Sequence, residues 1–184
     1  MKRGMDIVLS LVALLALSPL LLATALAIAW ESGFPVLFRQ TRVGLNGREF
    51  RMFKFRSMVK NAVAIGPYFT LANDPRITRV GRFIRRTSID ELPQLINVLN
   101  GDMSLVGPRP DVPAQRSLHS DAAWAQRCSV RPGITGLAQA LYRSDSTEVQ
   151  RLEADLRYTR EASLWLDLKI CWWTLRRLGG QGAN

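Results

Sequence analysis

The stretch DIVLSLVALLALSPLLLATALAIAWE, residues 6–31, decides the fold class of this chain. Residues 7–30 are apolar apart from four polar or irregular positions: Ser10, Ser18, Pro19 and Thr24. A run of this length is a candidate membrane segment, because a membrane span needs about 20 apolar residues. A core helix would show more of a polar face. A cleaved signal peptide is an alternative, since TALAIAW offers small residues, but its apolar region is usually only about 7 to 15 residues long.

The centre of this stretch is interrupted at Ser18-Pro19. Proline removes a backbone N–H and clashes with the preceding turn, so it predicts a break in the helix. Each half holds about twelve residues, or roughly 18 Å, so neither half crosses a hydrocarbon core of about 30 Å. Both flanks are basic, and positive charge favours the cytoplasmic side. We therefore predict a re-entrant helix-break-helix over residues 1–32 and a cytoplasmic, membrane-associated domain over residues 33–184; a full span with a kink is the alternative.

The composition points to an anionic partner without choosing one. The 184 residues include 25 basic and 15 acidic side chains, which gives a formal charge of +10. Such a balance favours nucleic acid, an anionic membrane surface or phosphorylated substrates. Cys128 and Cys171 are far apart and lack metal-ligand spacing, so neither a disulfide framework nor a zinc site is expected. Catalysis by a Ser–His or Cys–His pair would have to rest on His119, and is not expected either.

The segment after the membrane run predicts a β-hairpin. Residues 36–42 and 49–55 are strand-like, and Asn46-Gly47 between them suits a turn with positive φ. Strand alternation places Lys54 on one face with Phe50 and Met52. Lys54 or Arg56 could therefore line a site, and a role for both as edge-strand charges is the alternative. Residues 63–81, rich in Gly, Pro and Asn, predict a loop with little regular structure.

The block SIDELPQLINVLNGDMSLVGPRP, residues 88–110, allows two interpretations. Ser88-x-x-Glu91 matches a capping box at the start of a helix whose apolar stripe follows, and acidic residues suit a helix N-terminus. Pro93 disfavours that helix, because it would delete a backbone hydrogen bond. In the other interpretation, the adjacent carboxylates Asp90 and Glu91 belong to a site that handles phosphate. Arg109, stiffened by two flanking prolines, is well suited to phosphate oxygens.

The remainder of the chain is turn-rich and then helical. Residues 101–110 and 130–136 predict irregular structure, and helical periodicity returns from residue 145. Four charged residues there are expected on a solvated face: Glu153, Asp155, Arg157 and Arg160. Residues 163–178 predict an amphipathic helix with one apolar face: Leu164, Leu168, Cys171, Leu175 and Leu178. Tryptophan and basic residues flank that face, so it either lies at a membrane interface or packs on the protein's own core.

A membrane hairpin beside a basic, carboxylate-containing site suggests phosphoryl transfer with a lipid phosphate as one substrate. Such chemistry needs cations, commonly Mg²⁺ with Arg or Lys, and a carboxylate can itself be the nucleophile. The fold class that follows is α+β and helix-dominated: a re-entrant membrane hairpin, a small β-hairpin, and a cytoplasmic catalytic core with interfacial amphipathic helices. Two rivals remain open: a phosphotransferase that uses a metal-bound water, and a basic membrane-tethered scaffold or nucleic-acid-binding protein.

An ordered set of motifs resembles the bacterial sugar transferase family, the monotopic phosphoglycosyl transferases. The motifs are FRQTRVGLNG, FKFRSM, DPRITRVGRFIRRTSIDELPQLINVLNGDMSLVGPRP, VRPGITGLAQ and SLWLDLKI, and they extend over nearly the whole chain. The resemblance implies transfer of a sugar-1-phosphate from a UDP-sugar to a polyprenol phosphate, with undecaprenyl phosphate as the expected acceptor, and release of UMP. Larger members carry further N-terminal membrane helices, so this chain is expected to be a minimal catalytic form.

The resemblance also assigns roles to individual residues. It implies that Asp90 is a nucleophile forming an acyl phosphate, that Glu91 supports it, and that both lie at Mg²⁺. Basic residues near the phosphates and nucleotide are implied at Lys54, Arg85 and Arg109, and Arg56 joins them as a candidate from the strand pattern. Ser18 and Pro19 match the break of the re-entrant helix. Expected partners are the UDP-sugar, polyprenol phosphate, membrane lipids and a second copy in a homodimer, but no nucleic acid; the expected location is the cytoplasmic face of the bacterial inner membrane.

Overall fold

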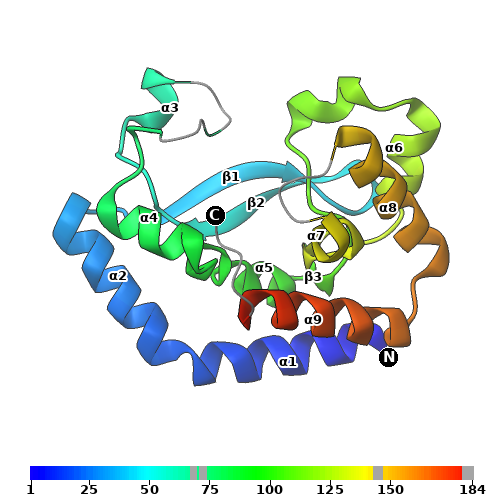
Figure 1. Cartoon of the computed structure of the whole chain (residues 1–184), viewed down its shortest axis with the longest axis horizontal. Coiled ribbons are helices and arrows are strands. Elements are labelled where there is room, and N and C mark those ends of the chain that lie inside the picture. The colour runs from blue at the N-terminus through cyan, green and yellow to red at the C-terminus, as the bar shows by residue number, and fades with distance from the viewer. Residues whose placement is uncertain (67–69, 71–73, 143–146, 180–184) are drawn as a thin grey trace.

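The computed structural model describes residues 1–66, 70, 74–142 and 147–179 (Figure 1). Helices dominate, as predicted, and a small antiparallel hairpin lies above α1, α5 and α9 in that view. The α-helices are α1 Lys2–Ala16, α2 Ser18–Ser32, α3 Ala62–Ile65, α4 Arg79–Arg86, α5 Gln94–Asn100, α6 Asp121–Arg127, α7 Leu137–Tyr142, α8 Glu148–Glu161 and α9 Leu164–Gly179. The strands are β1 Leu37–Val43, β2 Glu49–Phe55, β3 Ser104–Val106 and β4 Gly133–Thr135. Short 3₁₀ turns are η1 Leu45–Gly47, η2 Ile89–Glu91 and η3 Pro113–Leu118.

The predicted break in the N-terminal segment is confirmed. Helices α1 and α2 meet at an angle of 62°, with Pro19 in the first turn of α2 and the Ser18 hydroxyl donating to the Leu15 carbonyl at 2.8 Å. Within the described residues, no single helix is long and apolar enough to cross a membrane. The bent pair α1 and α2, taken together, meets these two criteria of length and composition. Both helices leave large apolar side chains uncovered, among them Leu15, Leu22, Leu26 and Trp30.

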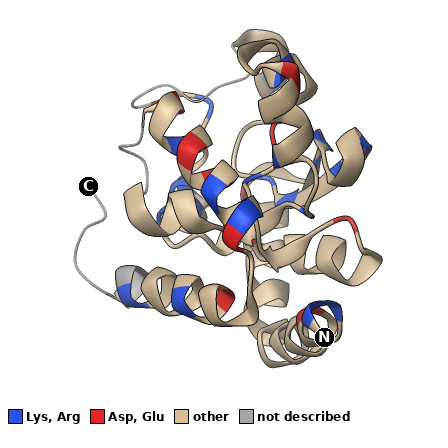
Figure 2. Ribbon diagram, turned by 90° about the vertical axis from the view of Figure 1, so that its right-hand side faces the viewer, with Lys and Arg blue, Asp and Glu red and all other residues tan. Residues whose placement is uncertain are grey.

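The start of α1 is fixed to the rest of the chain by polar contacts. Asp6 is 2% exposed, and it accepts hydrogen bonds from the Ser104 hydroxyl at 2.8 Å and the Leu105 amide at 3.2 Å. Arg3 donates to the Val98 carbonyl at 2.6 Å. Figure 2 shows charged residues at the end of this helix that is marked N. These hydrogen bonds hold the first turns of α1 against the segment that contains α5 and β3.

The predicted β-hairpin is also confirmed. Strands β1 and β2 pair antiparallel with Gln40 opposite Met52, and Asn46 (φ 55°) and Gly47 (φ 76°) make the turn. Met52 is buried in a core cluster with Val98 and Met103. The face that carries Met52 therefore packs toward α5, and this orientation sets the direction of Lys54 two residues later.

Of the two interpretations of the block that starts at Ser88, the capping box is not formed. The side chain of Ser88 caps nothing, because its backbone is left-handed with φ 58°. The block instead forms η2 and α5, with Pro93 at the N-cap of α5. Proline cannot supply the amide that a continuous helix needs at this point, so the α-helix begins only at Gln94. Helix α4 is capped by Thr78, whose Oγ1 accepts from the Gly81 amide at 2.9 Å.

The two turn-rich segments predicted to be irregular form a short parallel pair. Ser104 lies opposite Gly133 and Val106 opposite Thr135. The approach is so close that a Cβ on Gly133 would lie 2.1 Å from the Gly107 amide nitrogen, so only glycine fits. This pairing fixes the point from which the Pro108–Pro110 loop leaves the core.

Three further expectations are wrong or hold only for some of their residues. The predicted loop over residues 63–81 contains most of α3 and the start of α4, while residues 67–69 and 71–73 lie outside the described residues. Asp155 does not lie on a solvated face; it is 1% exposed. Helix α9 exposes an apolar face, although Leu164 and Cys171 are half-buried and the side chain of Leu178 lies outside the described part. The exposed members are Trp165, Leu168, Trp172 and Leu175.

Candidate active site

Glu91 lies between two cations that come from distant parts of the chain. Its Oε1 atom is 2.7 Å from Lys54 Nζ of β2 and 2.7 Å from Arg109 Nη2 of the loop after β3. The side chains of Lys54 and Glu91 are 16% and 20% exposed, whereas that of Arg109 is 41% exposed. The structure therefore joins three of the predicted site residues, and Arg109 is the one with the most surface left for a substrate.

Asp90 lies beside this cluster but is not bound into it. It is 9% exposed, and among the residues that the structure describes its carboxylate has no hydrogen bond or ion pair within 4.0 Å. Burial, and then the negative charge of Glu91, raise the pKa of Asp90 to about 6, although Lys54, Arg85 and Arg109 oppose the shift. A buried carboxylate with cations nearby, but none in contact, is available to react with a substrate.

The adjacent carboxylate has the opposite electrostatics. Burial acts to raise the pKa of Glu91, but the charges and hydrogen bonds of Arg109 and Lys54 outweigh it and lower the pKa to about 2. Glu91 is thus held ionised as a counter-ion, while Asp90 titrates near neutrality. Adjacent acids with separated pKa values are typical of sites that divide two chemical roles between them.

The local backbone explains how neighbouring side chains reach such different surroundings. Asp90 and Glu91 lie in the 3₁₀ turn η2, where successive residues are about 120° apart around the axis. The left-handed Ser88 sets the start of this turn, and Pro93 prevents it from continuing smoothly into α5. One acid therefore turns toward β2 and the Arg109 loop, and the other does not.

Two other predicted residues lie outside the Glu91 cluster. Arg85 Nη2 donates to Thr70 Oγ1 at 2.7 Å, and Arg85 acts on Asp90 through its charge. Arg56 donates to the carbonyl oxygens of Gly33 and Pro35 and, at 2.7 Å, to the Ser32 hydroxyl. Arg56 therefore fixes the connection between α2 and β1.

Sequence reasoning missed Arg42 and Arg127. Arg42 Nη1 donates to the Pro110 carbonyl at 2.9 Å, and its pKa is lowered to about 10 by burial and then by the charge of Arg109. Strand register could have found it, because Arg42 lies opposite Phe50 and so shares the face of Lys54. Arg127 donates to the Arg109 carbonyl, and no sequence pattern indicates that contact.

The described residues contain no group of three or more His, Cys, Asp or Glu side chains that could hold a metal ion by themselves. The donor set at the site consists of the adjacent carboxylates Asp90 and Glu91. Mg²⁺ is commonly held by one or two carboxylates together with substrate phosphates and water, and such a pair fits that kind of site.

The sequence profile of the bacterial sugar transferase family matches residues 1–180. The chain belongs to this family. The resemblance of its motifs is therefore confirmed over nearly its full length.

Three curated relatives are similar in sequence. The chain is 46% identical to the UDP-N-acetylgalactosamine-undecaprenyl-phosphate N-acetylgalactosaminephosphotransferase of Aeromonas hydrophila, over 100% of the chain and 45% of that relative. It is 48% identical to the undecaprenyl-phosphate glucose phosphotransferase of Komagataeibacter xylinus, over 96% of the chain and 35% of the relative. It is 45% identical to the UDP-glucose:undecaprenyl-phosphate glucose-1-phosphate transferase of Escherichia coli (strain K12), over 95% of the chain and 39% of the relative. The chain thus spans less than half the length of these three relatives.

Proposed function

We propose that the chain is a phosphoglycosyl transferase that moves a sugar-1-phosphate from a UDP-sugar to a polyprenol phosphate and releases UMP. One observation carries the proposal: in a member of the bacterial sugar transferase family, Asp90 is buried and has no bonded partner among the described residues, while Glu91 binds Lys54 and Arg109. The relatives named for undecaprenyl-phosphate sugar transfer support the choice of substrates. The test is turnover of UDP-glucose and UDP-N-acetylgalactosamine with and without undecaprenyl phosphate.

In the first step, a carboxylate oxygen of Asp90 attacks the β-phosphorus of the UDP-sugar. The bond from that phosphorus to the oxygen bridging the two phosphates breaks, and UMP leaves with the bridging oxygen and its electron pair. Asp90 then carries the sugar phosphate as an acyl phosphate. Arg109, whose side chain is half-exposed, and Lys54 lie where they can neutralise the charge that builds up on the phosphate oxygens.

In the second step, a phosphate oxygen of the polyprenol phosphate attacks the same phosphorus. The bond to Asp90 breaks, the carboxylate is regenerated, and the product is a polyprenyl-diphosphate sugar. Glu91 keeps Lys54 and Arg109 in place through both steps, because one oxygen of its carboxylate accepts from both cations. Bound Mg²⁺, held by Asp90 and Glu91 with the substrate phosphates, would supply positive charge that stabilises the leaving phosphate.

The acceptor is a lipid, so the site must lie next to a membrane. Many large apolar side chains along α1 and α2 are exposed, and α9 adds Trp165 and Trp172 on an exposed face with Leu168 and Leu175. Uncovered apolar surface of this extent, with tryptophan beside basic residues, suits burial in the outer layer of a bilayer. We propose the cytoplasmic face of the bacterial inner membrane as the location, with α1 and α2 entering and leaving the same leaflet.

The re-entrant arrangement predicts that a single cysteine placed before Lys2 is protected from a membrane-impermeant thiol reagent in intact cells, as is a cysteine in the β1–β2 turn. Permeabilisation should expose both. Replacing Pro19 with Leu should shift a fraction of the chains toward labelling from outside, because a continuous apolar helix of about 30 residues is long enough to span. Labelling of the N-terminal cysteine in intact wild-type cells would contradict the re-entrant topology.

The raised pKa of Asp90 predicts that the rate falls at acid pH, which gives the pH profile an acid limb. Attack requires the ionised carboxylate, so kcat/KM for the UDP-sugar should fall about tenfold for each pH unit below the Asp90 pKa of about 6. Measurement from pH 5 to pH 8 checks this. Burial also raises the pKa of Asp155 to about 6, so Asp155→Asn is the control and should keep the acid limb. A flat profile down to pH 5 would show that Asp90 is not the titrating nucleophile.

A further inference from the structure

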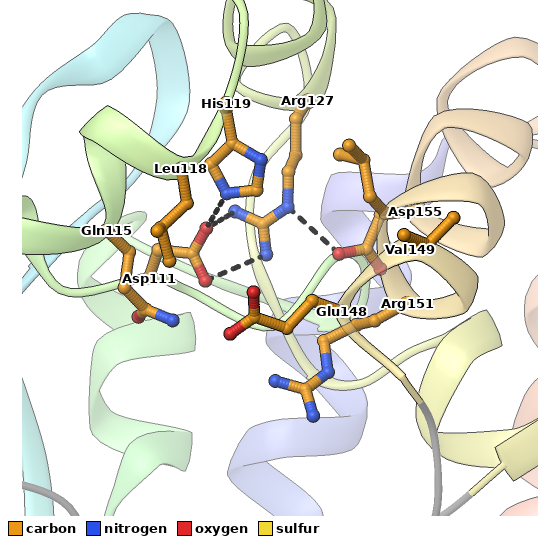
Figure 3. A pocket seen from close by; sticks show the side chains of 10 residues that line it. Asp111, Gln115, Leu118, His119, Arg127, Glu148, Val149, Arg151 and Asp155 are labelled. Atoms are coloured by element: carbon orange, nitrogen blue, oxygen red, sulfur yellow. Dashed lines mark hydrogen bonds and ion pairs between the residues drawn. The ribbon is translucent and has the colours of Figure 1, made fainter.

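Arg127 occupies a buried position behind the loop that carries Arg109. It is the last residue of α6 and is 6% exposed, and its guanidinium has three separate partners. Nε lies 2.9 Å from Asp155 Oδ2 of α8, Nη1 lies 2.7 Å from Asp111 Oδ2, and Nη2 donates to the Arg109 carbonyl. Figure 3 shows the guanidinium between the two carboxylates, which approach it from opposite sides.

These contacts reach Arg109 from its backbone rather than from its side chain. The guanidinium of Arg109 binds Glu91 at one end of the residue, while Arg127 binds its carbonyl at the other. Arg42 holds the next carbonyl, that of Pro110, at 2.9 Å. Two prolines limit the rotation of the loop. The hydrogen bonds to the Arg109 and Pro110 carbonyls therefore set the backbone position from which the Arg109 side chain extends.

The pair of acids around Arg127 makes its position rigid. Asp111 is 8% exposed and is also contacted by His119 Nε2 at 3.1 Å, and Asp155 is 1% exposed. A buried guanidinium with a carboxylate on each side cannot leave without exposing a buried charge to a low-dielectric interior, which is strongly unfavourable. Arg127 is therefore fixed more firmly than the half-exposed Arg109 that it holds.

We propose that Arg127 is a positioning residue for Arg109: it fixes the backbone from which Arg109 reaches the phosphates of the nucleotide sugar. The inference rests on the proposed function. Arg127 itself acts only through Arg109, since its three nitrogen atoms are all occupied by Asp155, Asp111 and the Arg109 carbonyl. A lysine at position 127 keeps the charge but has a single nitrogen in place of the fork, so it cannot make all three contacts.

A double-mutant cycle in the full chain, held in nanodiscs, tests this directly. Arg127→Lys should lower kcat/KM for the UDP-sugar on the order of 10- to 100-fold, as expected for a misplaced binding group. The kcat/KM for undecaprenyl phosphate should change less than about twofold, because this ratio reports only the second step, in which the lipid phosphate attacks after the nucleotide has left. In an Arg109→Lys background, Arg127→Lys should cost less than about threefold, since the side chain that it positions is already replaced.

Gln126→Met is the matched control, because Gln126 precedes Arg127 on α6 and ties that helix to the Leu156 carbonyl and, at 2.9 Å, to Thr159 Oγ1. It should lower the Tm as much as Arg127→Lys while leaving kcat/KM within about twofold. If Arg127→Lys does not fold, Arg127→Gln with Asp155→Asn removes one charge of each sign and takes its place in the cycle. Effects of positions 109 and 127 that multiply, or an Arg127 variant as active as wild type, would overturn the proposal. A wild-type chain that turns over no UDP-sugar would instead overturn the proposed function, and this inference with it.

Discussion

Asp90→Asn should abolish release of UMP from the UDP-sugar and, at the same time, stabilise the fold. Asparagine matches the size of aspartate but has no carboxylate to attack phosphorus, so the rate should fall by on the order of 10⁴-fold or more. The Asp90 side chain has no hydrogen bond to any described residue, so the substitution breaks no visible contact. Loss of activity with retained folding separates a nucleophile from a structural residue.

The gain in stability follows from the raised pKa of Asp90. Its value is about 6 in the folded chain against an ordinary 3.8, so the fold disfavours the ionised form. The resulting cost is present above pH 6 and disappears below about pH 4, where the acid is neutral in both states. Asp90→Asn removes that cost and should add about 3 kcal/mol to the free energy of unfolding at pH 7.5, with little change at pH 4. Chemical denaturation at both pH values, without substrate, checks the sign.

Glu91→Gln should damage both activity and stability. The pKa of Glu91 is about 2 against an ordinary 4.5, because Arg109 and Lys54 overcome the effect of burial, so its ionised form stabilises the fold. That contribution is fully present above pH 4.5 and is lost as the pH falls through 2. The substitution should therefore cost about 1 to 3 kcal/mol at pH 7.5, since it leaves two partly buried cations without a counter-ion.

The rate should also fall for Glu91→Gln, on the order of 100-fold or more, because Lys54 and Arg109, which we propose bind the phosphates, lose the acceptor that orients them. Glu161→Gln on α8 is the control: its partner Arg157 is exposed, at 60% of the side chain, so neither stability nor rate should change measurably. The two substitutions should therefore change the free energy of unfolding in opposite directions: Asp90→Asn should raise it and Glu91→Gln should lower it. Equal, small effects of both substitutions on unfolding would contradict the electrostatic division of the pair.

Features governed by local physics could be predicted from the sequence. Pro19 breaks the apolar helix because its missing amide acts within one turn, and Asn46-Gly47 makes the hairpin turn because it tolerates positive φ. The two-residue period of a strand then places Lys54 on the buried face. These signals lie within a few residues of the structure that they determine, so the chain around them cannot easily override them.

Features that depend on distant partners could not be predicted in this way. The parallel pairing of Ser104–Val106 with Gly133–Thr135 needs close contact between glycines about 26 positions apart, and each segment alone has the composition of a turn. Asp155 falls at a position where helix periodicity predicts solvent, but Arg127 on another helix draws it into the interior. The candidate site was identified by its motif, whereas the network behind Arg109 became visible only with the tertiary contacts.

A single-turnover experiment without lipid acceptor tests the central claim, covalent catalysis by Asp90, most directly. Purified full chain is mixed with a UDP-sugar and Mg²⁺ but no polyprenol phosphate, then quenched in acid and measured for UMP and for intact mass. We expect a burst of UMP that approaches one equivalent of enzyme, a mass increase of one sugar phosphate, and an adduct that maps to the peptide containing Asp90 and is missing in Asp90→Asn. Release of UMP only when polyprenol phosphate is present, with no adduct and with activity retained in Asp90→Asn, would contradict covalent catalysis by Asp90.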